Sequence, residues 1–151
     1  MSSIYPLVAA LLANVIAQVL KPIVLYFRTK ELDVHQCIAC GGFPSSHSST
    51  VTALTIAIGM NEGFDSALFA ITCVFSFIVI YDAANVRYYA GSNIQLTKQL
   101  ISDLETLKGL KFNDPIYHEK IKSVLGHKFI EILGGILLGI LVSLSMYQLI
   151  H

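Results

Sequence analysis

The chain has 151 residues, of which 54% are hydrophobic and only 13% are charged. This charged fraction is about half that of an ordinary soluble domain, which argues against a water-soluble protein and favours one in a bilayer. Ten basic residues balance ten acidic ones, so there is no overall basic field of the kind that attracts nucleic acid. The length predicts a single domain over 1–151.

The first apolar run, 5–27, is long enough to cross a hydrocarbon core of roughly 30 Å. No basic residue precedes it and it exceeds the length of a signal-peptide core, so we predict a retained transmembrane helix. Asn14, Gln18 and Lys21 share one face of this helix, and polar groups in membrane helices usually face a protein interior or a water-filled cavity. The alternative for Lys21 and for Arg28 is that they snorkel to the membrane surface.

A polar connection follows over 29–40 and contains Cys37 and Cys40 in a single CxxC. A structural zinc site would need a fourth ligand, and the chain has no second CxxC pair to provide one, so we interpret both thiols as free. Cys73 lies inside an apolar run and is interpreted as a packing residue.

The stretch 41–49 reads GGFPSSHSS and precedes an apolar run that predicts a second helix over 44–60, with Pro44 at its start. A helix N-terminus attracts anions, phosphate above all. The serines add hydroxyl donors, and His47 adds a proton that can move near neutral pH. We interpret the stretch as a phosphate site; the alternative is an N-capped helix whose serines pack against a neighbouring helix.

After a tight turn at 61–65, a third span is predicted over 66–86. Asp82 lies near its end and Arg87 directly after it. The two charged groups are five residues apart at a membrane edge, so they could be no more than an interfacial ion pair.

Residues 88–126 are predicted to be an extramembranous insertion, and a fourth span follows over 127–150. Four leucines recur at helical spacing in the insertion, which indicates an amphipathic helix on the membrane or over a site: Leu96, Leu100, Leu104 and Leu107. In the fourth span Gly135 and Gly139 suit close helix contact, within the chain or in a homo-oligomer. The expected fold is therefore all-α, an integral membrane four-helix bundle with this insertion between helices three and four.

Charge placement predicts the orientation of the chain. With four spans, all ten basic residues lie on or next to the side that carries the loops after helices one and three, while the opposite turn carries only Glu62 and Asp65. The positive-inside rule makes the basic side cytoplasmic. We expect a multi-pass protein of the plasma membrane whose site faces the cytoplasm.

Chemically competent residues from all four helices fall on that same side. Phosphoryl transfer needs such a set, because the transferring group carries spread negative charge and is stabilised mainly by positioning and electrostatics. The set comprises Lys21, Arg28, Ser45, Ser46, His47, Asp82, Arg87, His127 and Glu131. His127 and Glu131 are at i and i+4, so the carboxylate can reach the ring.

These residues resemble the motifs of the type 2 phosphatidic acid phosphatases, which are relatives of the vanadium haloperoxidases. The first motif, Lys-x6-Arg-Pro, is matched by Lys21 and Arg28, with Thr29 in place of proline. The second, Pro-Ser-Gly-His, is matched at 44–47 with Ser46 in place of glycine.

The third motif, Ser-Arg-x5-His-x3-Asp, is matched in two parts. Arg87 follows a valine, and His127 and Glu131 lie beyond the insertion 88–126, with glutamate replacing aspartate. The whole chain resembles the divergent, short branch of the family, whose recurring stretches GG-x-PSSHS, DA-x-x-VR and LGH-x-x-x-E correspond to 41–48, 82–87 and 125–131.

The resemblance implies a role for each residue. His127 is the nucleophile, Glu131 orients it, and His47 protonates the leaving oxygen. The residues that would bind phosphate are Lys21, Arg28, Ser45, Ser46 and Arg87. Asp82, which has no counterpart in the motifs, and Gly42 are supporting candidates. No metal or other cofactor is implied.

The expected function is therefore a metal-independent, vanadate-sensitive lipid-phosphate phosphatase that forms a phosphohistidine. Its substrate would be a phosphomonoester or pyrophosphate of a lipid or isoprenoid, and no nucleic-acid partner is expected. The alternatives are a non-catalytic protein that binds or moves an anionic lipid, a structural helical membrane protein, and a haloperoxidase.

Overall fold

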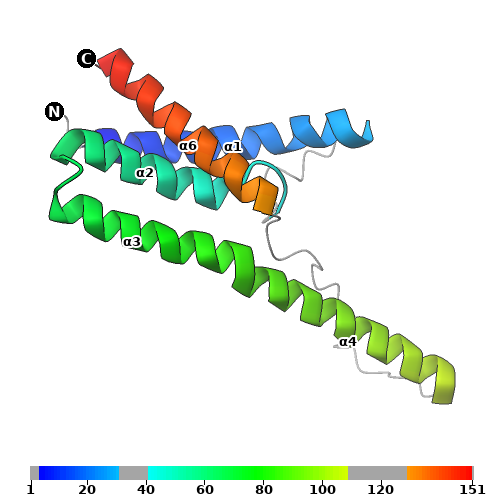
Figure 1. The fold of residues 1–151 in the computed structure, drawn as a ribbon. Helices are drawn as coiled ribbons and strands as arrows, with labels where there is room; N and C mark the ends of the chain where they lie inside the picture. The colour runs from blue at the N-terminus through cyan, green and yellow to red at the C-terminus, as the bar shows by residue number, and fades with distance from the viewer. Residues whose placement is uncertain (1–3, 31–40, 109–128, 151) are drawn as a thin grey trace.

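The computed structural model describes residues 4–30, 41–108 and 129–150, and every regular element in these ranges is helical (Figure 1). This confirms the all-α class. The elements are α1 (Tyr5–Thr29), α2 (Ser46–Glu62), α3 (Ala67–Tyr81), the π-helix η2 (Asp82–Val86), α4 (Arg87–Lys108) and α6 (Phe129–Ile150).

Three of the described helical stretches are long and apolar enough to cross a membrane: Tyr5–Phe27, Ala67–Asn85 and Phe129–Ile150. They match the first, third and fourth predicted spans. The predicted span over 44–60 does not meet this standard, because α2 has only 17 residues and opens on serines and a histidine.

The environment of α2 explains its composition. It packs against α1, α3 and α6, so much of its surface faces protein. Its buried positions include Ser48, Ser49, Ala53 and Ala57. A helix enclosed in this way needs small side chains that let its neighbours approach, rather than the large apolar ones that face lipid.

The helices α1, α2, α3 and α6 lie side by side and alternate in direction (Figure 1). The end of α1, the start of α2, the end of α3 and the start of α6 therefore lie at one end of the group, which we call the site end. Both chain termini lie at the opposite end (Figure 1).

Buried polar side chains connect the helices. The Tyr5 hydroxyl donates to the Ser143 carbonyl oxygen at 2.8 Å and links α1 to α6. The Asn14 amide donates to the Thr50 hydroxyl at 2.9 Å and links α1 to α2. The polar face predicted for the first helix thus faces the protein interior, where each such bond contributes about 0.6 kcal/mol on average.

Two glycines bring α6 onto α2. A Cβ atom on Gly135 would overlap the Ser45 carbonyl oxygen, and one on Gly139 would lie 2.5 Å from the Ser49 carbonyl oxygen. The prediction of close helix contact is confirmed. The contact lies within the chain, so these glycines do not supply a surface for a homo-oligomer.

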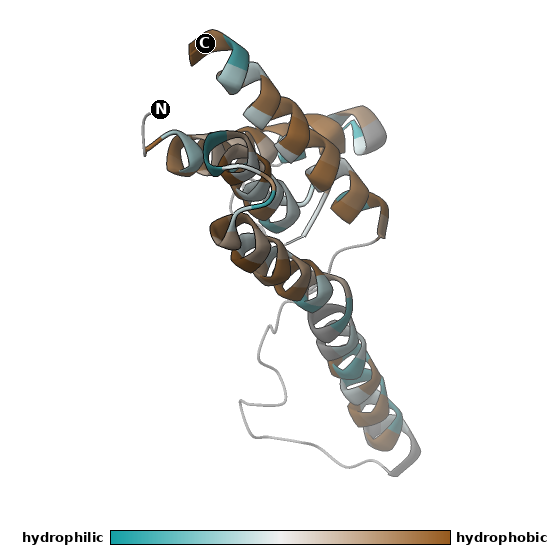
Figure 2. Ribbon diagram, turned by 60° about the vertical axis from the view of Figure 1, so that its left-hand side comes forward, coloured by the Kyte–Doolittle hydropathy of each residue, from teal (hydrophilic) through white to brown (hydrophobic). Residues whose placement is uncertain are grey.

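The insertion after α3 differs from its prediction. The leucine spacing is helical, as expected, but α4 continues α3 through η2 as one long rod that projects beyond the site end (Figure 1). Figure 2 shows the mainly apolar colour of α3 giving way to a mixture along α4. Leu96 and Leu100 remain exposed. The described part of the insertion therefore does not cover the site.

Candidate functional site

A tight turn and an N-cap build the start of α2. Gly42 has φ +96°, a conformation that favours glycine. Ser45 is the N-cap, and its hydroxyl accepts a hydrogen bond from the Ser48 amide at 3.3 Å. The helix consequently begins at Ser46 rather than at Pro44, because the extended cap residue separates the proline from the first turn.

The same turn is fastened to α6. The Ser45 amide donates to the Glu131 carbonyl oxygen at 2.9 Å. Glu131 is buried and lies in the first turn of α6, where a carboxylate is stabilised by the positive end of the helix dipole. Since this link runs between main-chain atoms, it fixes the two helix starts to each other whatever the side chains do.

Lys21 enters the site from α1. It is 2% exposed, although it lies within the candidate span Tyr5–Phe27, so the interpretation that it snorkels to the surface is wrong. Its Nζ lies 3.5 Å from the Ser46 hydroxyl oxygen, at the long limit for a hydrogen bond. Ionisable groups held inside a membrane protein are costly and mark functional positions.

Two sources of positive potential thus coincide at Ser46. One is the Lys21 ammonium, and the other is the N-terminus of α2, which carries about half a unit of positive charge. An anion bound at this point would be stabilised by both. The arrangement suits a phosphate group at the site end.

The serines of this turn divide into two groups. The Ser45 hydroxyl is engaged by both the amide and the hydroxyl of Ser48, and the Ser49 hydroxyl donates to the Ser46 and Ala13 carbonyl oxygens. Their roles fit the alternative of capping and small-residue packing. The Ser46 hydroxyl is the one beside Lys21, so it is the better placed of the two serines predicted to bind phosphate.

His47 is the only residue of 45–49 that is not buried. It follows Ser46 in the first turn of α2, and its Nδ1 atom is buried. A partly accessible imidazole beside an anion site can exchange protons with a bound ligand.

The remaining predicted residues lie near the same end to differing extents. Asp82 is half-buried and is the first residue of η2, while the main chain of Arg28 lies in the last turns of α1 and that of Arg87 begins α4. His127 lies outside the described residues, as do the free-thiol candidates Cys37 and Cys40.

Two features of the site were not predicted. The π-helix begins at Asp82, and single π-turns inside α-helices frequently mark functional sites. The buried Gln18 Oε1, one turn from Lys21 in α1, has no hydrogen-bond donor within the described part of the chain. The polar face of α1 indicated Gln18, whereas no local sequence signal identifies the π-helix.

The described residues contain no group of three or more His, Cys, Asp or Glu side chains that could hold a metal ion. Lys21 and the start of α2 can supply electrostatic stabilisation of an anion, and a histidine such as His47 can transfer a proton.

A family model described as "Divergent PAP2 family" matches residues 3–142, which include every candidate site residue. The "Uncharacterized membrane protein YuiD" of Bacillus subtilis (strain 168) is 36% identical over 147 residues, covering 94% of this chain and 93% of that protein. No solved structure matches the chain. The apolar helices and this relative together indicate a membrane protein.

Proposed function

This chain belongs to the divergent PAP2 family, and on that premise we propose that it is a membrane lipid-phosphate phosphatase. It hydrolyses a phosphomonoester or pyrophosphate of a lipid or isoprenoid without a metal ion. The observation that carries the proposal is the Lys21 contact with Ser46 at the start of α2, beside the main-chain bond from Ser45 to Glu131. Residues far apart in the sequence meet there and place a cation beside a helix N-terminus, an arrangement that favours phosphate binding.

Binding of the phosphate comes first in the proposed mechanism. The Lys21 ammonium and the positive N-terminal end of α2 hold the phosphoryl oxygens, with the Ser46 hydroxyl as a further donor. Arg28 and Arg87 are proposed to add bidentate contacts. These groups stabilise the charge that spreads over the equatorial oxygens in the transition state.

Two histidines then divide the chemistry. A ring nitrogen of His127 attacks phosphorus and forms a phosphohistidine as the bond to the lipid oxygen breaks, while Glu131 accepts a hydrogen bond from the other ring nitrogen. His47 donates its proton to the departing alkoxide. In the second half, His47 takes a proton from water, which attacks phosphorus, breaks the bond to nitrogen and releases phosphate.

One observation favours a second candidate function. The Ser45 hydroxyl is fully buried in its capping bonds, so the serine that opens the motif is occupied structurally. Binding phosphate through that hydroxyl would require it to exchange those bonds. A non-catalytic protein that binds or moves an anionic lipid would need the cation and the helix start but no chemistry.

The test is a phosphatase assay on purified protein with EDTA, over a panel of lipid monophosphates and pyrophosphates. We expect phosphate release that vanadate inhibits, a fall on the order of 10²–10⁴-fold for His47→Asn, and loss of turnover for His127→Ala. His151→Asn, a histidine with no proposed role, is the matched control. Retention of labelled lipid phosphate without any release would favour the second candidate, and unchanged turnover in His127→Ala would exclude the proposed mechanism.

A further inference from the structure

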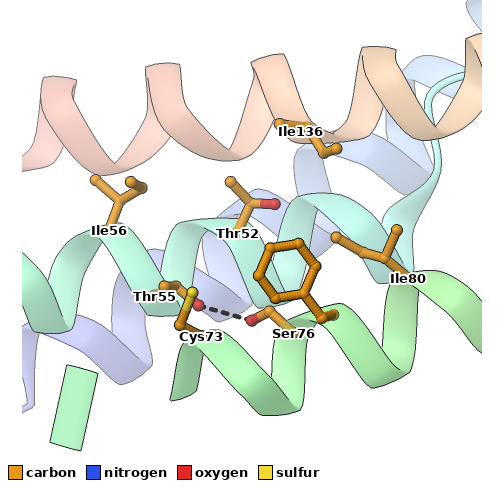
Figure 3. A pocket seen from close by; sticks show the side chains of 8 residues that line it. Thr52, Thr55, Ile56, Cys73, Ser76, Ile80 and Ile136 are labelled. Atoms are coloured by element: carbon orange, nitrogen blue, oxygen red, sulfur yellow. Dashed lines mark hydrogen bonds between the residues drawn. The ribbon is translucent and has the colours of Figure 1, made fainter. Parts of the chain in front are cut away.

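A groove lies between α2, α3 and α6, with a volume of about 150 Å³ (Figure 3). We call it the lateral groove. Thr52 and Ile56 of α2 form its floor, Cys73 and Ile80 of α3 one wall, and Ile136 of α6 the other (Figure 3). Phe77 of α3 also lines it.

The surface of the groove is hydrocarbon in character. Two of the hydroxyls that line it are already used, because Thr55 and Ser76 are bonded to each other at 2.6 Å and Ser76 donates to the Val51 carbonyl oxygen at 3.1 Å (Figure 3). The exposed groups are mainly methyl, methylene and aromatic carbons. Such a surface offers no partner to a polar ligand.

The residues that line the groove lie near the site end on all three of its helices. Thr52 lies six residues after Ser46, which is about 9 Å along α2, and Ile136 lies five residues after Glu131, about 7.5 Å along α6. Ile80 lies two residues before Asp82. The groove thus begins within two helical turns of the candidate phosphate site.

The groove also opens sideways. Both of its walls, α3 and α6, belong to candidate membrane spans, and Phe77 is 70% exposed although it lines the groove. At that depth the surroundings of a membrane protein are lipid chains, so a hydrocarbon chain can enter without crossing water.

We propose that the lateral groove holds a short stretch of one hydrocarbon chain of the substrate, beyond the carbons nearest the phosphate, while the phosphate binds beside Lys21. This inference rests on the proposed function. A volume of about 150 Å³ fits a short stretch of one chain and not a whole lipid tail. A second chain, where the lipid has one, stays in the bilayer.

The groove acts by positioning rather than by affinity. A chain that moves from the bilayer into an apolar groove leaves one hydrocarbon environment for another, so there is no hydrophobic gain. What the groove fixes is the depth and direction of the chain, and hence the position of phosphorus relative to the catalytic groups. Misplacement by about 1 Å can cost on the order of 100-fold in rate.

The test fills the groove and compares two substrates. Ile136→Phe adds bulk where Ile136 faces the groove, and Leu137→Phe adds the same ring type at a neighbouring α6 position that is 62% exposed. We measure kcat/KM on a long-chain lipid phosphate and on a four-carbon alkyl phosphate in the same detergent. The ratio of long-chain to short-chain kcat/KM should fall on the order of tenfold or more in Ile136→Phe and keep its wild-type value in Leu137→Phe. Equal ratios in both variants would overturn the proposal.

A binding measurement separates failure of the groove from failure of the proposed function. With Cys37 and Cys40 replaced by serine, Cys73 is the remaining thiol and it lines the groove. A non-hydrolysable long-chain phosphonate should slow alkylation of Cys73, and a four-carbon phosphonate should not. Protection without turnover on any substrate would overturn the phosphatase and retain the groove. Turnover without protection of Cys73 would overturn the groove and retain the phosphatase.

Discussion

Replacement of Gly135 by alanine tests the packing that joins the two halves of the candidate site. The added methyl group would overlap the Ser45 carbonyl oxygen and lie 2.9 Å from Ser48 Cβ. The main-chain bond from Ser45 to Glu131 prevents the start of α2 from moving aside independently. To restore an ordinary contact, α6 must shift by roughly 1 Å relative to α2.

Two measurable consequences follow from that shift. Overpacking of this kind costs about 1–3 kcal/mol in the free energy of unfolding. A displacement of about 1 Å between the helix starts should lower kcat/KM on the order of 100-fold. The assays are reversible unfolding in mixed detergent micelles and phosphate release from the preferred lipid phosphate.

Gly134→Ala is the matched control. A Cβ atom at Gly134 would meet the ring of Phe43, a half-buried side chain that can turn aside, rather than main-chain atoms. Alanine is also the better helix former by about 1 kcal/mol, so this variant should keep or gain stability. Equal stability and activity of the two variants would refute the reasoning that the Gly135 contact sets the position of α6.

Three further predictions concern charge, capping and orientation. Lys21→Met should raise the inhibition constant for vanadate about tenfold to 100-fold, because a charge-assisted contact is lost. The control Lys98→Met, on an exposed position of α4, should leave that constant unchanged. Equal inhibition constants in the two variants would remove Lys21 from the phosphate site. Ser45→Ala should lower the free energy of unfolding by about 1 kcal/mol through loss of the N-cap, and an unchanged unfolding midpoint would count against that role. In a cysteine-free background, Lys30→Cys should react with a membrane-impermeant thiol reagent added on the cytoplasmic side, and Glu62→Cys with the same reagent added on the other side. The reverse pattern would show that the predicted orientation is inverted.

The polar face of α1 shows what local patterns can predict. Asn14 and Lys21 lie on the face that α1 turns to the protein, as their helical spacing indicated. The spacing of Gly135 and Gly139 likewise predicted a close contact. Helical periodicity determines which residues share a face, but it does not identify the partner. The structure identifies that partner as α2 and not a second molecule.

The differences concern features set by neighbouring elements. The helix over 44–60 was predicted to be the second of four spans. The corresponding helix α2 is shorter than the three candidate spans, and its polar and small residues are enclosed by three other helices. The insertion was predicted to hold an amphipathic helix on the membrane or over a site, and in the structure α4 continues α3 through η2 without a break. A π-helix has no signature within its own residues, and the small residues of α2 indicate close packing without identifying the three helices that enclose it.

The amino-acid sequence alone determined the helical class, the membrane setting and the set of candidate residues, because apolar length, charge placement and motif spacing are properties of consecutive residues. The tertiary structure decided which of those residues meet. In the folded chain Lys21 is buried beside Ser46, and the Ser45 hydroxyl caps α2. The Ser45 amide donates a hydrogen bond to the Glu131 carbonyl oxygen. Those outcomes depend on the directions of α1, α2 and α6 and on how closely glycine lets them approach, and both are set by contacts between residues far apart in the chain.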